Sequence, residues 1–188
     1  MILPATEDVT GNVCERINMA VILLVVIAVL VAIDQLVKHW AVVSLKPVGS
    51  IDFIHFGSFK VLNLTYLEND GALFGSMSGQ RWFLIGFTAL VIVLGIVGMI
   101  MALKRSKFLS FSIMLFVAGG IGNFIDRIRF GYVVDMFEFK FVHFAIYNVA
   151  DICVTFAFIF VIIYMIFIDP KIEKAKKAAK LEAEKTEI

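Results

Sequence analysis

Four long, uncharged apolar segments constrain this chain more than any other feature. They cover residues 17–33, 82–103, 108–125 and 152–168. A helix needs about 17–25 mostly apolar residues to cross a bilayer, and each segment has about that length. Hydrophobic residues make up 61% of the chain, whereas a soluble domain has about 45–50%. The sequence therefore predicts an α-helical membrane protein with four transmembrane helices.

The region between the first two spans, residues 41–81, has a different pattern. Glycines and Pro47 interrupt short β-favouring runs, and residues 59–67 alternate between two faces as a strand does. Residues 68–71, Glu-Asn-Asp-Gly, are typical of a turn. Residues 137–141 also alternate. Since an open sheet edge cannot face lipid hydrocarbon, we predict a small extracytoplasmic β-sheet lying on the membrane surface.

Lysine and arginine predict the orientation of the spans. Ten of the 17 flank one side, six of them in the tail 169–188, and seven are spread over the longer loops of the other side. Cytoplasmic flanks carry the excess of positive charge. Both termini are therefore expected in the cytoplasm, with residues 1–16 a loosely ordered leader and residues 169–188 a solvated basic helix.

With this topology, four aspartates lie at the same extracytoplasmic border: Asp34, Asp126, Asp135 and Asp151. Two carboxyl groups that converge in a partly desolvated place share one proton, and such a pair can supply both a general base and a general acid. Carboxylates at a membrane border also belong to ion pathways or to purely structural clusters. The spacing alone leaves a protease and a proton-coupled transporter about equally supported. It also leaves open which aspartates would pair.

Two further observations bear on these alternatives. A proton relay needs ionisable side chains across the depth of the membrane. Apart from cysteine and tyrosine, the spans 17–33, 82–103 and 152–168 contain none. This absence favours chemistry at the membrane border over transport. Asp34 and Lys38 lie at i and i+4 on one helix face and can form an ion pair, which is as consistent with an interfacial anchor as with catalysis.

Other hydrolytic designs fit less well. The sequence has no serine nucleophile turn, no His-Glu-x-x-His zinc helix and no Gly-x-Gly-Asp motif, and its two cysteines lack metal-ligand spacing. Three histidines are scattered and receive no role: His39, His55 and His143. No metal site is predicted.

Five short motifs together resemble those of the lipoprotein signal peptidase (signal peptidase II) family. They are, in order, Asp34-Gln35-x-x-Lys38, Asn69-x-Gly71-Ala72, Gly122-Asn123-x-x-Asp126-Arg127, Val133-Val134-Asp135 and Asn148-x-Ala150-Asp151. Each is weak alone, but five in the right order are specific, and the resemblance covers about residues 17–168.

The resemblance implies a bacterial inner-membrane aspartic endopeptidase that cuts prolipoproteins just before a diacylglyceryl-modified cysteine. It assigns catalysis to Asp135 and Asp151, and it makes Asp126 a supporting neighbour, which we expect Arg127 to neutralise. It implies no cofactor, no metal and no nucleic acid; its partners would be the prolipoprotein and membrane lipids, and we expect a monomer. Supporting positions carried over in the same way are Asn69, Asn123, Arg127 and Asn148 around the site, and Asp34, Lys38 and Gly71 in the fold.

The chain departs from the family pattern at two positions beside the last motif. Tyr147 stands where the family usually has phenylalanine, and Ile152 where it usually has serine. The second change removes a hydroxyl group that is able to donate a hydrogen bond to Asp151. Neither departure touches the two aspartates themselves.

Overall fold

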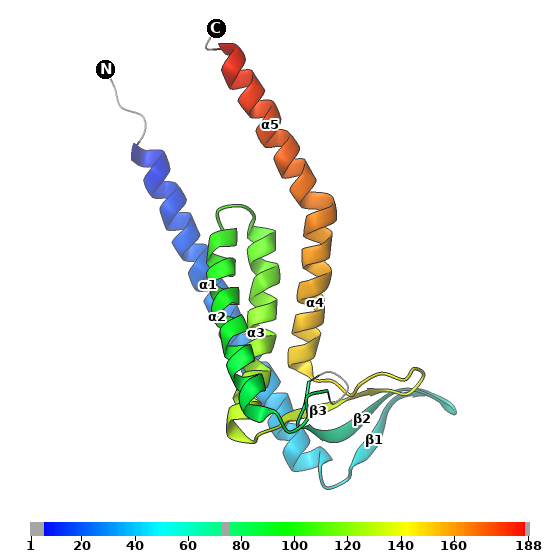
Figure 1. Ribbon diagram of the computed structural model, residues 1–188. Helices are drawn as coiled ribbons and strands as arrows, with labels where there is room; N and C mark the ends of the chain where they lie inside the picture. Colours follow the sequence, from blue (N-terminus) through cyan, green and yellow to red (C-terminus); the bar gives the residue numbers. More distant parts are fainter. Residues whose placement is uncertain (1–5, 73–75, 187–188) are drawn as a thin grey trace.

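The computed structural model describes residues 6–72 and 76–186 and is mainly helical (Figure 1). Within these residues, four helices are long and apolar enough to cross a membrane, which confirms the predicted four spans. The helices are α1 (Thr6–Trp40), α2 (Arg81–Ala102), α3 (Lys107–Arg129), α4 (Val149–Ile163) and α5 (Asp169–Thr186), with π-helical turns η1 (Ala41–Leu45) and η3 (Tyr164–Ile168).

The first helix is longer at both ends than the predicted span. It begins at Thr6, so the described part of the leader is helical instead of loosely ordered; residues 1–5 lie outside the described part. Extending an existing helix costs little, because the expensive step is its nucleation. An ion pair between Lys107 and Glu15 also ties this extension to the start of α3. At its other end the helix continues through η1 to Leu45, into the region predicted as β.

Three strands form one antiparallel sheet in the described part of the chain, in the order β1 (Ser50–Phe56), β2 (Phe59–Asn69) and β3 (Val133–Phe139). The strand predicted at residues 59–67 is β2, and the alternation at 137–141 marks the end of β3. The predicted turn begins later than expected, because β2 continues to Asn69. The side-chain oxygen of Asn69 then accepts a hydrogen bond from Gly71 N at 3.1 Å, which bends the chain away from the sheet.

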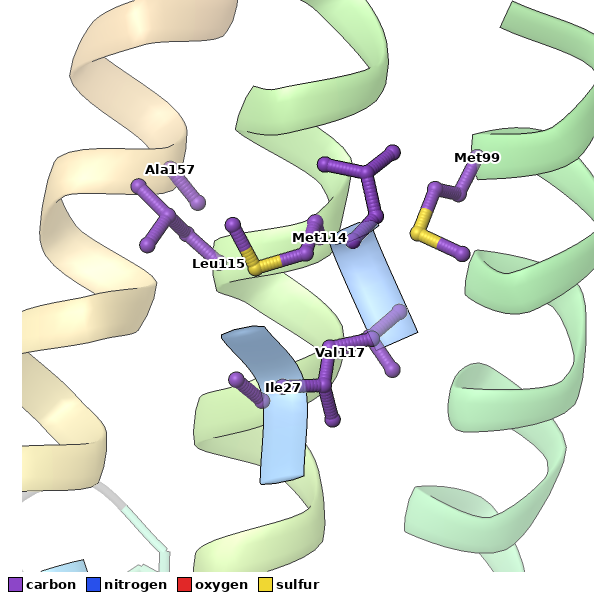
Figure 2. Close-up of a cluster of buried hydrophobic side chains, with 8 residues drawn as sticks. Ile27, Met99, Met114, Leu115, Val117 and Ala157 are labelled. Atoms are coloured by element: carbon purple, nitrogen blue, oxygen red, sulfur yellow. The ribbon is translucent and has the colours of Figure 1, made fainter. Parts of the chain in front are cut away.

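Helix α3 is the centre of the bundle and packs against α1, α2 and α4. Figure 2 shows the apolar core at this point, with Met114 and Val117 of α3 facing Ile27 of α1 and Met99 of α2. The sheet lies at one end of the bundle, and the start of α1 and the end of α5 lie toward the other (Figure 1). A second apolar cluster attaches it there, made by Ala41, Leu45, Leu64, Val134 and Met136.

Small residues allow α3 and α4 to approach closely. A Cβ atom added at Gly119 would collide with the carbonyl oxygen of Ala150 and would lie 2.7 Å from a methyl group of Val154. Close helix approach through glycine is a common means of packing helices in membranes, where lipid is as apolar as the side chains. It brings the first turn of α4 against the last turns of α3.

We therefore predict that Gly119→Ala destabilises the protein. The added methyl group meets backbone, which cannot move aside as a flexible side chain can, so the loss should be about 1–3 kcal/mol. Thermal unfolding in detergent micelles measures it. Gly98→Ala in α2 is the matched control, since no atom lies within 4 Å of the added Cβ there. Equal midpoints for the two variants would contradict this account of the α3–α4 contact.

Candidate active site

Lys38 holds two of the four border carboxylates. Its ammonium lies 2.9 Å from Asp34 Oδ2 and 3.0 Å from Asp126 Oδ2, and all three side chains are at least 96% buried. The pair predicted between Asp34 and Lys38 at i and i+4 is present. Lys38 thus joins α1 to α3.

The partner expected for Asp126 was wrong. Its carboxylate contacts Lys38, accepts from Gln35 Nε2 at 2.9 Å and accepts from Val134 N at 3.1 Å. Arg127 instead donates to the carbonyl oxygen of Gly71 at 2.9 Å. Neighbours in sequence point in different directions around a helix, so Asp126 and Arg127 cannot face each other across α3.

Asp135 and Asp151 come together although they belong to different elements. Asp135 is buried on β3, and Asp151 is half-buried in the first turn of α4. Asn148 lies between them: its Nδ2 donates to Asp135 Oδ1 at 2.6 Å, and its backbone N–H donates to Asp151 Oδ2 at 3.2 Å. Both aspartates line one cavity of about 510 Å³. The chain does turn back between them, as their separation in sequence requires.

The orientation of two asparagine amides follows from backbone groups. Asn148 caps α4, so its Oδ1 must accept from Asp151 N, at 3.0 Å, which leaves its NH₂ group toward Asp135. The Oδ1 of Asn69 accepts from Gly71 N, and its NH₂ group donates to Asp135 Oδ2 at 2.9 Å. A backbone N–H can only donate, so neither amide can be reversed without losing a hydrogen bond. Both oxygens of Asp135 therefore face fixed donors.

Asn123 serves Asp151 in the same way. Its Nδ2 donates to Asp151 Oδ1 at 2.8 Å, and its Oδ1 accepts from Lys38 Nζ at 2.9 Å and from Asn148 Nδ2 at 3.1 Å. Three of the positions predicted around the site donate to the two aspartates and Arg127 lines their cavity, whereas Asp126 contacts Lys38 and does not line the cavity; the three donors are Asn69, Asn123 and Asn148.

Sequence reasoning missed some residues of the site. Gln35 lies within the first motif but received no role, although it donates to Asp126 and to the carbonyl oxygen of Gly122. The aromatic wall of the cavity was also missed; it contains Phe139, Phe144, Tyr147 and Phe156. The phenylalanine alternation around residue 139 was visible, but the sequence does not show which face of the strand meets the cavity.

Burial changes the protonation of Asp135. Removal from water raises the pKa of this carboxyl group to about 7; the hydrogen bond from Asn69 opposes the shift, and the nearby charge of Asp151 adds to it. With a pKa of about 7, the Asp135 carboxyl group is largely protonated below neutral pH, and a carboxyl dyad needs one such proton if it is to act as acid and base. Among residues 6–72 and 76–186, no three His, Cys, Asp or Glu side chains are grouped so as to hold a metal ion.

Comparison with known proteins identifies the family. The profile of the family described as signal peptidase (SPase) II matches residues 26–167. The chain belongs to the signal peptidase II family. A lipoprotein signal peptidase of Streptococcus thermophilus is 40% identical over 141 residues, which cover 75% of this chain and 90% of that protein. One from Lactococcus lactis subsp. lactis is 39% identical over 140 residues, covering 74% and 90%.

Solved structures agree with this assignment. A bacterial membrane enzyme solved by the in meso method at 2.3 Å resolution is 29% identical, with a TM-score of 0.62 over 80% of this chain and 87% of its own. A second such structure, at 1.9 Å, has the same identity and TM-score and covers 82% and 94%. The protein is a multi-pass bacterial membrane peptidase, and membership of the signal peptidase II family favours the protease over the transporter.

The raised pKa of Asp135 predicts a pH-dependent stability. Folding strengthens proton binding at this site, so the stability it contributes is full below about pH 4 and is lost as pH rises through about 7. Asp135→Asn cannot lose a proton. Between pH 5 and 8, the free energy of unfolding of the wild type should therefore fall relative to that of the variant by a few kcal/mol, at about 1.4 kcal/mol per pKa unit, and its thermal midpoint should fall with it.

Asp52→Asn is the control for this measurement. Asp52 is exposed, and the hydrogen bond from Lys60 lowers its pKa, so it does not titrate between pH 5 and 8. A difference between wild type and Asp135→Asn that stays constant over this range would show that Asp135 is not protonated near neutral pH.

Proposed function

We propose that this protein removes the signal peptide from prolipoproteins by cutting just before a diacylglyceryl-modified cysteine, with Asp135 and Asp151 as its catalytic residues. The observation that carries the proposal is the convergence of these two carboxyl groups on Asn148 at the edge of one cavity. The names of its relatives supply the class of substrate.

The chemistry needs one ionised and one protonated carboxyl group. A water molecule between them gives a proton to the ionised group while its oxygen bonds to the scissile carbonyl carbon, and the protonated group gives its proton to the carbonyl oxygen. Collapse of the tetrahedral intermediate breaks the C–N bond, and the nitrogen takes up a proton from the pair. The amide donors of Asn69, Asn123 and Asn148 hold both carboxyl groups in place during these transfers.

The cavity suits a substrate that carries lipid. Its polar end is formed by the two aspartates with Asn69, Asn123 and Arg127, and the rest of its wall is largely apolar. Part of that wall comes from α4, where Phe156 is 48% exposed on a helix that crosses the membrane. Acyl chains attached near the scissile bond would remain beside this helix in the bilayer while the peptide reaches the aspartates.

Arg127 is available to bind the peptide backbone. Its side chain lines the cavity, and its terminal nitrogens donate to the carbonyl oxygens of Gly71 and Asn123. Its buried Nε atom has no hydrogen-bond partner within the described residues. A buried N–H without a partner costs about 1–3 kcal/mol, and a carbonyl oxygen of the bound peptide would satisfy it.

The orientation that we propose puts both termini in the cytoplasm and the cavity at the extracytoplasmic face. It rests on the excess of lysine and arginine on one side of the spans and on the place of the sheet, which lies at the end of the bundle away from the start of α1 and the end of α5 (Figure 1). This is the face at which exported prolipoproteins would present their signal peptide.

The decisive test is cleavage of a lipid-modified prolipoprotein by purified wild type, Asp135→Asn and Asp151→Asn. Each dyad variant should be folded and should lose activity by at least about 10³-fold, because it removes the acid or the base. An unlipidated substrate should not be cut. Asp126→Asn is the comparison variant. If it alone lost activity, the catalytic pair would be misassigned. If wild type cut neither substrate, the proposed function would be wrong.

A second experiment tests Arg127. Arg127→Lys keeps the positive charge but removes Nε together with the terminal nitrogens that donate to Gly71 and Asn123. KM for the lipidated substrate should therefore rise at least about tenfold, the value expected for one lost hydrogen bond to a charged group. Arg129→Lys is the matched control, since Arg129 is exposed in the last turn of the same helix. An unchanged KM for Arg127→Lys would exclude this contact with substrate.

A further inference from the structure

We infer that Lys38 is a positioning residue for catalysis: its ammonium group sets the orientation of the Asn123 amide and so gives Asp151 a fixed hydrogen-bond donor. This inference rests on the proposed catalytic pair. It assigns Lys38 a role beyond holding the fold together, which is what its position in the first motif implied.

All the protons of the Lys38 ammonium have acceptors, one on its own helix α1 and two on α3. Its Nζ lies 2.9 Å from Asp34 Oδ2, 3.0 Å from Asp126 Oδ2 and 2.9 Å from Asn123 Oδ1. The side chain is 4% exposed. An ammonium group has three N–H donors and no acceptor, so this set of contacts uses it completely.

The contact with Asn123 decides which way that amide faces. An asparagine side chain has nearly the same shape in its two orientations, but an ammonium group accepts nothing and must meet the oxygen. The NH₂ group of Asn123 is then on the opposite side, 2.8 Å from Asp151 Oδ1. If the amide were reversed, its NH₂ group would face Lys38 and its oxygen would face the carboxylate of Asp151.

Asn148 donates to the same oxygen of Asn123, at 3.1 Å. This neutral hydrogen bond acts in the same direction as the bond from Lys38, but bonds from an ionised donor are roughly twice as strong. Lys38 is therefore the stronger of the two groups that hold the amide. The result is a one-way sequence of donors from Lys38 through Asn123 to Asp151.

Two carboxylates contact Lys38 and offset its positive charge, so its effect on the catalytic pair is not that of an unpaired cation. Asp34 of α1 and Asp126 of α3 both contact it, so the three groups together carry a net negative charge when ionised. The other charged groups around them are Asp151 of α4, Asp135 of β3 and Arg127 of α3. The charge of Lys38 also acts on Asp135 through space, whereas the hydrogen-bonded route from Lys38 to the pair runs through Asn123 to Asp151.

Burial in an ion cluster is weak evidence that Lys38 serves only to stabilise the fold. Apolar replacements of similar volume are often as stable as a buried ion pair, whereas removal of one partner alone is strongly destabilising. The test must therefore conserve net charge. Asp34→Asn combined with Lys38→Met has the net charge of the wild type. Asp34→Asn alone is the reference, since it keeps Lys38 and Asn123 together. The step between them removes one positive charge, but it does so equally with and without Asn123, so this charge effect cancels in a cycle over the two backgrounds.

The experiment is a double-mutant cycle on kcat for the lipidated substrate. With Asn123 present, adding Lys38→Met to Asp34→Asn should lower kcat about 10- to 100-fold, as loss of residues that orient a catalytic group commonly does, with KM little changed. With Asn123→Ala in the background, the same addition should change kcat by less than about twofold, because the route is already cut. Thermal unfolding checks that each variant is folded.

A fall in kcat by the same factor in both backgrounds would overturn the inference, because Lys38 would then act through the fold and not through Asn123. Asp126→Asn combined with Lys38→Met, referred to Asp126→Asn, is a second charge-conserving cycle with the same expected result. Asp135→Asn and Asp151→Asn are measured alongside. If these keep activity, the catalytic pair is wrong; if they are inactive and the cycle is additive, the role of Lys38 alone is wrong.

Discussion

Four carboxyl groups lie at one end of this helical bundle. The groups that pair with them or donate hydrogen bonds to them come from different helices and strands, so these contacts join most elements of the fold. A buried carboxylate is tolerated only when it is paired or receives hydrogen bonds. Asp34 of α1 accepts from Ala150 N at the start of α4, at 2.9 Å, and Asp126 of α3 accepts from Val134 N of β3. Lys38 joins the two. The polar cluster thus fixes where α4 and the sheet meet the bundle, and with them the two remaining carboxyl groups.

This cluster requires helices that approach closely. A Cβ atom at Gly122 would lie 2.5 Å from Asp34 Oδ2 and 3.1 Å from the side chain of Ala150. The bare backbone of α3 at this position leaves room for the Asp34 carboxylate to reach α4. Glycine therefore serves the electrostatics here as well as the packing, since a larger residue would separate the carboxylate from the backbone N–H that it needs.

Much of the fold could be predicted from the sequence, because its signals are local. Span length, the strand alternation of residues 59–67 and the i, i+4 pair of Asp34 and Lys38 each depend on neighbours in the chain. The partner of Asp126 was predicted wrongly because it depends on a contact that is distant in sequence. Its partner Lys38 is 88 residues away on another helix, while the adjacent Arg127 points elsewhere. The pairing of Asp135 with Asp151 is also a contact between distant residues. Spacing does not show which residues the β3–α4 connection brings together, so only the family resemblance predicted this pair.

The donors around Asp151 explain how the chain tolerates its departure from the family at residue 152. One oxygen of Asp151 accepts from Asn123 Nδ2 and the other from Asn148 N, so both are occupied without a hydroxyl group from the next residue. Ile152 instead contributes apolar surface to the cavity wall. The donor from Asn123 belongs to the third motif and does not depend on residue 152; its direction is fixed by Lys38 of α1. The orientation of Asp151 consequently depends on the amide of Asn123 more than it would with a serine beside it.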